Sequence, residues 1–183
     1  MSEFSNYKNN FQEFVNGLQD CYIEKLVYVE DLEPTFDKAS LPFEFRYCFS
    51  TTFVTDKGSF LLHTSQTSLG YETFWIDSNK AINKATSERL INSKVKTVSS
   101  QNKYTDLPYK LSIELEKGIL NIYAAEIYDD ADKMYTIKVN DEMVFVFDDN
   151  HEAKKFEESI TTANMWLSAI LVGTISSEKA DKH

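Results

Sequence analysis

Histidine is the scarcest of the residues that could carry chemistry in this chain. There are three histidines, and His183 lies at the end, which leaves His63 and His151 for proton transfer or metal binding. His151 and Glu152 begin a metalloprotease-like pattern, but Lys155 occupies the position of the second histidine. His63 has the form of one half of a paired-histidine phosphoesterase site, and the second half is missing. We therefore expect neither activity.

Motifs for nucleotide and acyl chemistry are also absent. The chain has five glycines and contains no GxxxxGK[ST], GxGxxG or GxSxG sequence. The acidic turn with Asp129, Asp130 and Asp132 lacks the glycine and the distal glutamate of a calcium loop. We expect no metal and no cofactor, and a binding protein rather than an enzyme.

One polar segment interrupts two aromatic stretches. It runs from His63 to Glu72 and contains a series of small hydroxyl side chains. Hydrogen-bonding groups beside aromatic rings could line a small-ligand pocket. The residues of this alternative hypothesis are His63, Gln66, Tyr71, Glu72 and Trp75. The simpler interpretation is a polar outer face of a strand, followed by a polar turn.

The charge of the chain indicates what it binds. The formal net charge is −10, which disfavours nucleic acid and anionic membranes because the long-range field repels phosphate. The same field speeds association with a basic protein. We therefore expect an inhibitor or immunity protein that covers a basic partner. The expected contact surface consists of the acidic turns Asp129, Asp130, Asp132, Asp141, Glu142, Asp148 and Asp149.

The chain carries no recognisable address for export or for a membrane. Its N-terminus lacks the basic region and apolar run of a signal peptide. The longest apolar stretch, residues 165–172, is too short to span a bilayer. Cys21 and Cys48 lie in apolar surroundings without CxxC spacing, as buried free cysteines do. These features favour a cytoplasmic location.

Hydrophobic periodicity predicts an α+β fold. An apolar stripe predicts a helix from near Ser5 to Leu18. Asp149 and Glu152 form a capping-box pattern before a second helix, which carries Phe156 on its apolar face. We expect one domain over residues 1–175, a flexible tail over 176–183, and both helices on one face of the sheet. A short helix is expected to cross the sheet within residues 78–92.

Two-residue alternation predicts the strands. They form an antiparallel sheet of roughly six to eight strands. Hairpin turns are expected at residues 56–58, 116–118 and 140–141. The candidate segments for these strands cover residues 22–29, 43–50, 59–66, 71–76, 94–99, 109–115, 119–128, 135–139 and 143–147. Of these, residues 22–29 could instead continue the first helix, and residues 94–99 alternate only imperfectly.

The order of these elements is similar to that of small acidic secretion chaperones, although this chain has more strands. The similarity implies a third hypothesis, a homodimer that holds an extended peptide against a strand or helix surface. No motif supports it beyond the order of the elements.

Overall fold

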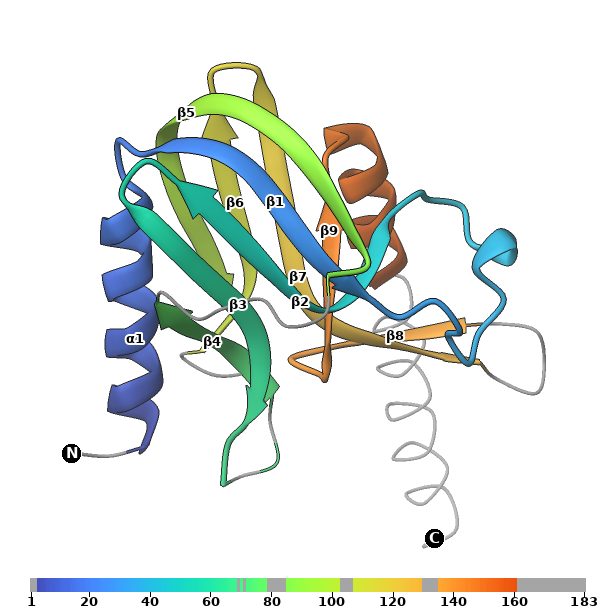
Figure 1. Cartoon of the computed structure of the whole chain (residues 1–183). Coiled ribbons are helices and arrows are strands. Elements are labelled where there is room, and N and C mark those ends of the chain that lie inside the picture. The colour runs from blue at the N-terminus through green and yellow to red at the C-terminus, as the bar shows by residue number, and fades with distance from the viewer. Residues whose placement is uncertain are drawn as a thin grey trace, which may run out of the picture.

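The fold is mainly β, with a helix at each end of the described chain (Figure 1). The computed structural model describes residues 3–68, 70, 72–78, 85–102, 107–129 and 135–160. Helix α1 spans Glu3–Leu18, a short 3-10 helix η1 spans Lys38–Ser40, and residues 150–160 are helical. The strands are β1 (Tyr22–Glu30), β2 (Arg46–Thr55), β3 (Gly58–Gln66), β4 (Glu72–Ser78), β5 (Ser87–Asn102), β6 (Pro108–Leu115), β7 (Gly118–Asp129), β8 (Tyr135–Val139) and β9 (Met143–Phe147).

Six of the strands form a closed ring. The hydrogen-bonded order β1–β5–β6–β7–β9–β2 returns to its start, because β2 also pairs with β1. Every pairing is antiparallel, and the hairpin β3–β4 extends the sheet from β2. Figure 1 shows these strands curving around a common interior. Ring closure leaves few exposed sheet edges, which limits unwanted pairing with other chains.

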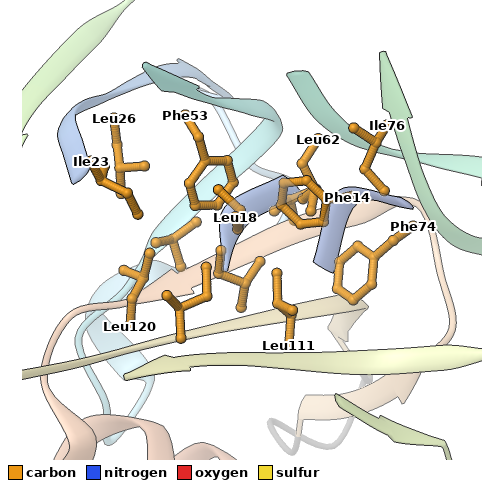
Figure 2. Packing of buried hydrophobic residues seen from close by; sticks show 14 of the residues in the cluster. Phe14, Leu18, Ile23, Leu26, Phe53, Leu62, Phe74, Ile76, Leu111 and Leu120 are labelled. Atoms are coloured by element: carbon orange, nitrogen blue, oxygen red, sulfur yellow. The ribbon is translucent and has the colours of Figure 1, made fainter. Parts of the chain in front are cut away.

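Two separate hydrophobic cores lie on opposite faces of β7 and β9. Ile122 and Val146 belong to the core inside the ring. Figure 2 shows Phe14 and Leu18 of α1 in the same core. The next residue along β7, Tyr123, points to the other core, which residues 150–160 cover. Successive side chains of a strand point to opposite faces, so β7 and β9 are buried on both sides.

The alternation of apolar residues was a good guide to the local elements. The structure confirms the helix that ends at Leu18, the strands at 22–29 and 59–66, and the turns at 56–58 and 116–118. It places the start of β2 at Arg46, later than predicted. The apolar face predicted for the second helix is buried as far as Ile160, and its continuation lies outside the described residues. The 176–183 tail lies outside them as well.

The predicted hairpin at Asn140 and Asp141 is wrong. Both β8 and β9 pair with β7, and Ala125 faces Val139 in one ladder and Met143 in the other. Residues 140–142 are therefore an excursion between two segments that both run antiparallel to β7. Asn140 has a φ of 58°, a left-handed conformation that asparagine tolerates. Hairpin turns also require residues that tolerate a positive φ, so Asn140 and Asp141 resemble a hairpin turn in the sequence.

The helix predicted within residues 78–92 is wrong where the structure describes it. Residues 87–92 belong to β5, which pairs with β1. Leu90 and Ile91 imitated a helical stripe because β5 contains a bulge here: Ile23 faces Ser93 and Lys25 faces Leu90, so two residues oppose one. A bulge shifts the two-residue period and hides the strand in the sequence.

The two helices do not share a face of the sheet, contrary to expectation. Helix α1 packs on the core inside the ring, which we call the inner core. Residues 150–160 pack on the core at the opposite face of β7 and β9, which we call the outer core. Helix α1 also covers the edge of β4, where the Asn10 amide donates to the Ile76 carbonyl at 2.8 Å and accepts from the Ile76 N–H at 2.9 Å. None of the helices in the described ranges is long and apolar enough to cross a membrane.

Candidate functional site

A hollow rich in charged side chains lies where β1, β2 and β9 meet the loop before β2 and the start of the 150–160 helix. Its volume is about 620 Å³. We call it the charged depression; five carboxylates and two cations line it, and its residues are Glu30, Lys38, Glu44, Phe45, Arg46, Val146, Asp148, Asp149 and Glu152. A second hollow of about 570 Å³ shares Lys38, Glu44, Phe45 and Glu152 with it, so the two are contiguous.

One wall of the charged depression is an internal ion pair. The Arg46 guanidinium donates to the Glu30 carboxylate at 2.5 Å, and the Ser87 hydroxyl donates to the same oxygen at 2.6 Å. Burial alone would raise the pKa of Glu30, but these two hydrogen bonds and the guanidinium charge hold it below its ordinary value. The guanidinium also lies over the ring of Tyr28, 4.7 Å from its centroid. Glu30 is therefore a fixed anion.

The opposite wall is the start of the 150–160 helix. The Asp149 carboxylate accepts from the His151 N–H at 2.7 Å, as a helix cap does. The capping box is half confirmed, because Glu152 instead accepts from the Glu44 N–H at 2.8 Å and from the Lys155 ammonium at 2.7 Å. The Lys155 hydrogen bond and then the Glu44 amide lower the pKa of Glu152. Glu152 thus ties the loop to the helix.

The remaining charges differ in how much they are engaged. Asp148 forms an ion pair with Arg89. Glu44 uses its backbone amide in the contact with Glu152, which leaves its exposed carboxylate without an ion pair within the described residues. The Lys38 ammonium lies 4.9 Å from the centroid of the Phe45 ring, so this ring face already accommodates a cation.

Aromatic packing holds the floor of the charged depression in place. Phe45 is 8% exposed and stacks on Phe145, with ring centroids 5.0 Å apart. Phe145 in turn contacts Phe156 of the helix at 5.2 Å. Close-packed rings transmit strain and resist movement. The charged side chains are therefore mounted on a rigid support.

A second group of acids lies near the excursion between β8 and β9. We call Glu72, Glu126, Asp141 and Glu142 the carboxylate cluster. Burial, and then the charges of Asp141 and Glu142, raise the pKa of both Glu72 and Glu126, although Glu126 accepts hydrogen bonds that act in the opposite direction. The Lys138 ammonium, 2.8 Å from Asp141, compensates only part of this charge. Such destabilising groupings are enriched at functional sites.

The acidic residues predicted as one contact surface are divided between these two places. Asp148 and Asp149 line the charged depression, whereas Asp141 and Glu142 belong to the carboxylate cluster. The whole of β9 separates the two pairs, and a strand of that length rises about 17 Å. Asp129 ends β7 opposite Tyr135. The other two predicted residues, Asp130 and Asp132, lie outside the described part of the chain.

His63 is engaged by its own neighbours. Its Nδ1 lies 2.7 Å from the Thr64 carbonyl oxygen, and its Nε2 lies 3.4 Å from a carboxylate oxygen of Asp77. Trp75 faces it on the adjacent strand. Neither hollow described above includes His63 in its lining.

The other members of the ligand-binding hypothesis do not converge on His63. The Tyr7 hydroxyl donates to the Gln66 carbonyl at 3.0 Å, and the Tyr7 ring meets Trp75 edge-on at 5.1 Å. Glu72 belongs to the carboxylate cluster instead. Tyr71 lies outside the described residues.

Sequence reasoning missed the charged residues on the near side of the charged depression. The alternation of Glu44 with aromatic residues predicts only the solvated face of a strand, and no pattern marks Glu30, Lys38 or Arg46 as site residues. The only signal was the alternation of Glu44 and Arg46 with aromatic residues. It marks a polar face without showing that the helix start at 150 lies opposite, since that contact spans more than a hundred residues.

The described residues contain no group of three or more histidine, cysteine, aspartate or glutamate side chains arranged to hold a metal ion. Cys21 and Cys48 are free and buried, as expected. Burial raises the pKa of the Cys48 thiol to about 12, which makes it a poor nucleophile.

No family model, curated protein or solved structure matches this chain.

Proposed function

We propose that this protein binds a basic partner protein through the charged depression, as an inhibitor or immunity protein would. The observation that carries the proposal is the excess of carboxylates over cations in a hollow of about 620 Å³. The net charge of −10 adds a long-range attraction for a basic partner. The charge thus favours association, and the hollow provides a defined place for it.

The chemistry of the lining favours arginine or lysine side chains of the partner. An arginine guanidinium forms paired hydrogen bonds with a carboxylate, and Glu44 presents an exposed one. Phe45 at the floor offers a ring face on which Lys38 already rests. A partner arginine that took this position would gain both a cation–π contact and a charge-assisted hydrogen bond.

The rigidity of the site supports binding over catalysis. The Glu30–Arg46 and Glu152–Lys155 pairs hold their carboxylates in place before any partner arrives. Preorganised groups lose less conformational entropy on association, which raises affinity. Both glutamates have lowered pKa values, so neither is suited to act as a general acid at neutral pH.

The test is affinity capture from a lysate of the native cell with three immobilised proteins: wild type, Glu44→Lys and Glu13→Lys. Glu44 is exposed on the charged depression, and its contact with Glu152 uses only the backbone. Glu13 is exposed on α1, which lies on the far side of the molecule (Figure 1). The control therefore matches the change in net charge without touching the site.

We expect one basic protein to be retained by wild type and by Glu13→Lys at low salt, and to be released at higher salt as ions screen the contact. Glu44→Lys should weaken its binding at least about tenfold, which corresponds to about 1.4 kcal/mol. Equal retention by all three proteins would exclude the charged depression as the contact. If wild type retains no basic protein, the proposed function itself fails.

A further inference from the structure

The chain between β1 and β2, residues 31–45, forms a long loop that stands out from the sheet (Figure 1). Its two ends lie together, because the Asp31 N–H donates to the Tyr47 carbonyl at 2.9 Å. Compact loops of this length whose ends adjoin are called Ω-loops; they are packed by their own side chains and are frequently functional. We call residues 31–45 the Ω-loop.

Aromatic side chains anchor the Ω-loop to the rest of the protein. The Phe36 ring meets the Tyr47 ring edge-on, with centroids 5.1 Å apart. The Phe43 ring is perpendicular to the Phe156 ring, with centroids 5.3 Å apart. Between these anchors the loop forms the short helix η1. The loop is therefore ordered before any partner arrives, which lowers the entropic cost of binding.

The hollow of about 570 Å³ beside the charged depression lies between the Ω-loop and the start of the 150–160 helix. We call it the loop hollow. Its residues are Lys38, Ala39, Leu41, Pro42, Phe43, Glu44, Phe45, Glu152 and Lys155.

The loop hollow and the charged depression differ in chemistry. Five of the nine residues that line the loop hollow are apolar, against two of the nine that line the charged depression. The charges of the loop hollow also balance, with two cations and two carboxylates, whereas the charged depression has five carboxylates and two cations. The charged depression therefore favours a cationic side chain of the partner, and the loop hollow favours an apolar one.

The apolar part of the loop hollow is open to a partner. Ala39 and Pro42 are exposed and Leu41 is half-buried, so a partner side chain can reach all three. Phe43 and Phe45 also line the hollow and are buried, with ring centroids 5.4 Å apart. An aliphatic side chain placed here would remove apolar surface from water on both proteins.

Both cations of the loop hollow already have contacts. The Lys155 ammonium donates to Glu152 at 2.7 Å, and the Lys38 ammonium lies 4.9 Å from the centroid of the Phe45 ring. An acidic side chain of the partner would have to compete with these contacts, and the carboxylates of the neighbouring charged depression would repel it. A neutral apolar side chain meets neither obstacle.

The two hollows are close enough to take two side chains of one segment. Glu44 and Glu152 line both of them, and the hydrogen bond from the Glu44 N–H to the Glu152 carboxylate marks their boundary. In an extended segment, side chains two positions apart point to the same side and lie about 7 Å from one another. An extended segment of the partner can therefore fill both hollows with residues two positions apart.

We propose that the contact segment of the partner carries an arginine and, two positions away, an aliphatic residue. The arginine enters the charged depression, and the aliphatic side chain enters the loop hollow. This inference rests on the proposed function and adds to it the short sequence that the site selects.

The test is a titration with blocked tripeptides, followed by NMR of two backbone amides. Ala39 lines the loop hollow but not the charged depression, and Arg46 lines the charged depression but not the loop hollow. The probes are acetyl-Leu-Gly-Arg-amide and acetyl-Arg-Gly-Leu-amide, which present the same side chains in the two chain directions; the tighter of the two is the reference peptide. Two controls keep its order: the glycine control replaces the leucine by glycine, and the glutamine control replaces the arginine by glutamine.

Leu41→Ala and Leu32→Ala are a matched pair of variants for the same titrations. Leu41 lines the loop hollow. Leu32 belongs to the same Ω-loop, is 72% exposed and lines neither hollow. The two variants lose the same atoms from the same loop, and they differ in whether the lost atoms face the loop hollow.

We expect the reference peptide to shift the Ala39 and Arg46 amide signals of wild type. The glycine control should bind about three- to tenfold more weakly, since it lacks the partial burial of one aliphatic side chain. Leu41→Ala should weaken binding of the reference peptide by about two- to fivefold and leave binding of the glycine control unchanged. Leu32→Ala should match wild type with every peptide.

The inference is overturned if the reference peptide leaves the Ala39 amide unshifted, or if wild type binds the glycine control as tightly as the reference peptide. Tight binding of the glycine control together with weak binding of the glutamine control would overturn this inference alone, because the arginine would still be recognised. Equal binding of the glutamine control and the reference peptide would count against the proposed function as well, because the charge of the partner would then contribute nothing.

Discussion

In the native state, the surroundings of Glu72 disfavour the charged form of its carboxylate. The residue is 8% exposed, and burial is the main cause of its raised pKa, followed by the charges of Glu142 and Asp141. Among the described residues, Lys138 acts in the opposite direction. Glu72→Gln removes the charge and keeps the shape of the side chain, so we expect the free energy of unfolding to increase.

The size of this increase follows from the neighbours of Glu72. A like-charge contact between strands costs about 0.2–1 kcal/mol. Two carboxylates repel Glu72, the single cation offsets about one of them, and burial adds to the remaining cost. We expect a gain of about 1 kcal/mol at neutral pH, which raises Tm by roughly 2–4 °C in a chain of this length.

The gain from Glu72→Gln should depend on pH. Because the pKa of Glu72 is raised in the native state, the native protein binds this proton more readily than the unfolded chain does. The charged carboxylate therefore destabilises the protein above its native pKa, and the penalty disappears as the pH falls through that value. Below about pH 4 both states are largely protonated, and the variant and wild type should differ little.

Urea unfolding, followed by tryptophan fluorescence at about pH 7 and about pH 4, measures both expectations. Glu24→Gln is the matched control, because Glu24 is exposed on β1 and its variant should match wild type at both pH values. If Glu72→Gln is less stable than wild type at neutral pH, the carboxylate cluster is not repulsive. An equal gain at both pH values would mean that charge is not the cause.

Two further substitutions test the packing that positions these sites. Asn10→Ala removes two hydrogen bonds to the backbone of Ile76; we expect a loss of about 1–3 kcal/mol and faster hydrogen exchange at the Ile76 amide, and unchanged exchange there would contradict the edge contact. Phe156→Ala removes a fully buried ring whose centroid lies 4.8 Å from that of Tyr123 and 5.0 Å from that of Phe147. We expect a loss of about 3–5 kcal/mol in thermal or urea unfolding, and a loss below about 1 kcal/mol would show that residues 150–160 do not cover the outer core.

Much of the candidate site lay beyond sequence reasoning. Asp148 and Asp149 could be named, since an acidic pair before an apolar stripe marks the start of a helix. Glu30 and Glu44 could not, because each gains its role from a contact with a residue far along the chain, Ser87 for Glu30 and Glu152 for Glu44. Acidity alone predicts attraction for basic partners and leaves open where on the surface they bind.

The sequence by itself determined most of the local elements of this protein, with the first half of β5 and the turn at Asn140 and Asp141 as the exceptions. Side-chain period reflects which face of a helix or strand is buried, and that signal is contained in a few consecutive residues. Only the tertiary structure decided how the strands close into a ring, that the two helices cover different cores, and that residues 140–142 continue a strand direction instead of reversing it. These outcomes depend on pairing and packing between residues distant in the chain, where many arrangements satisfy the same local pattern and the burial of the whole sheet selects one.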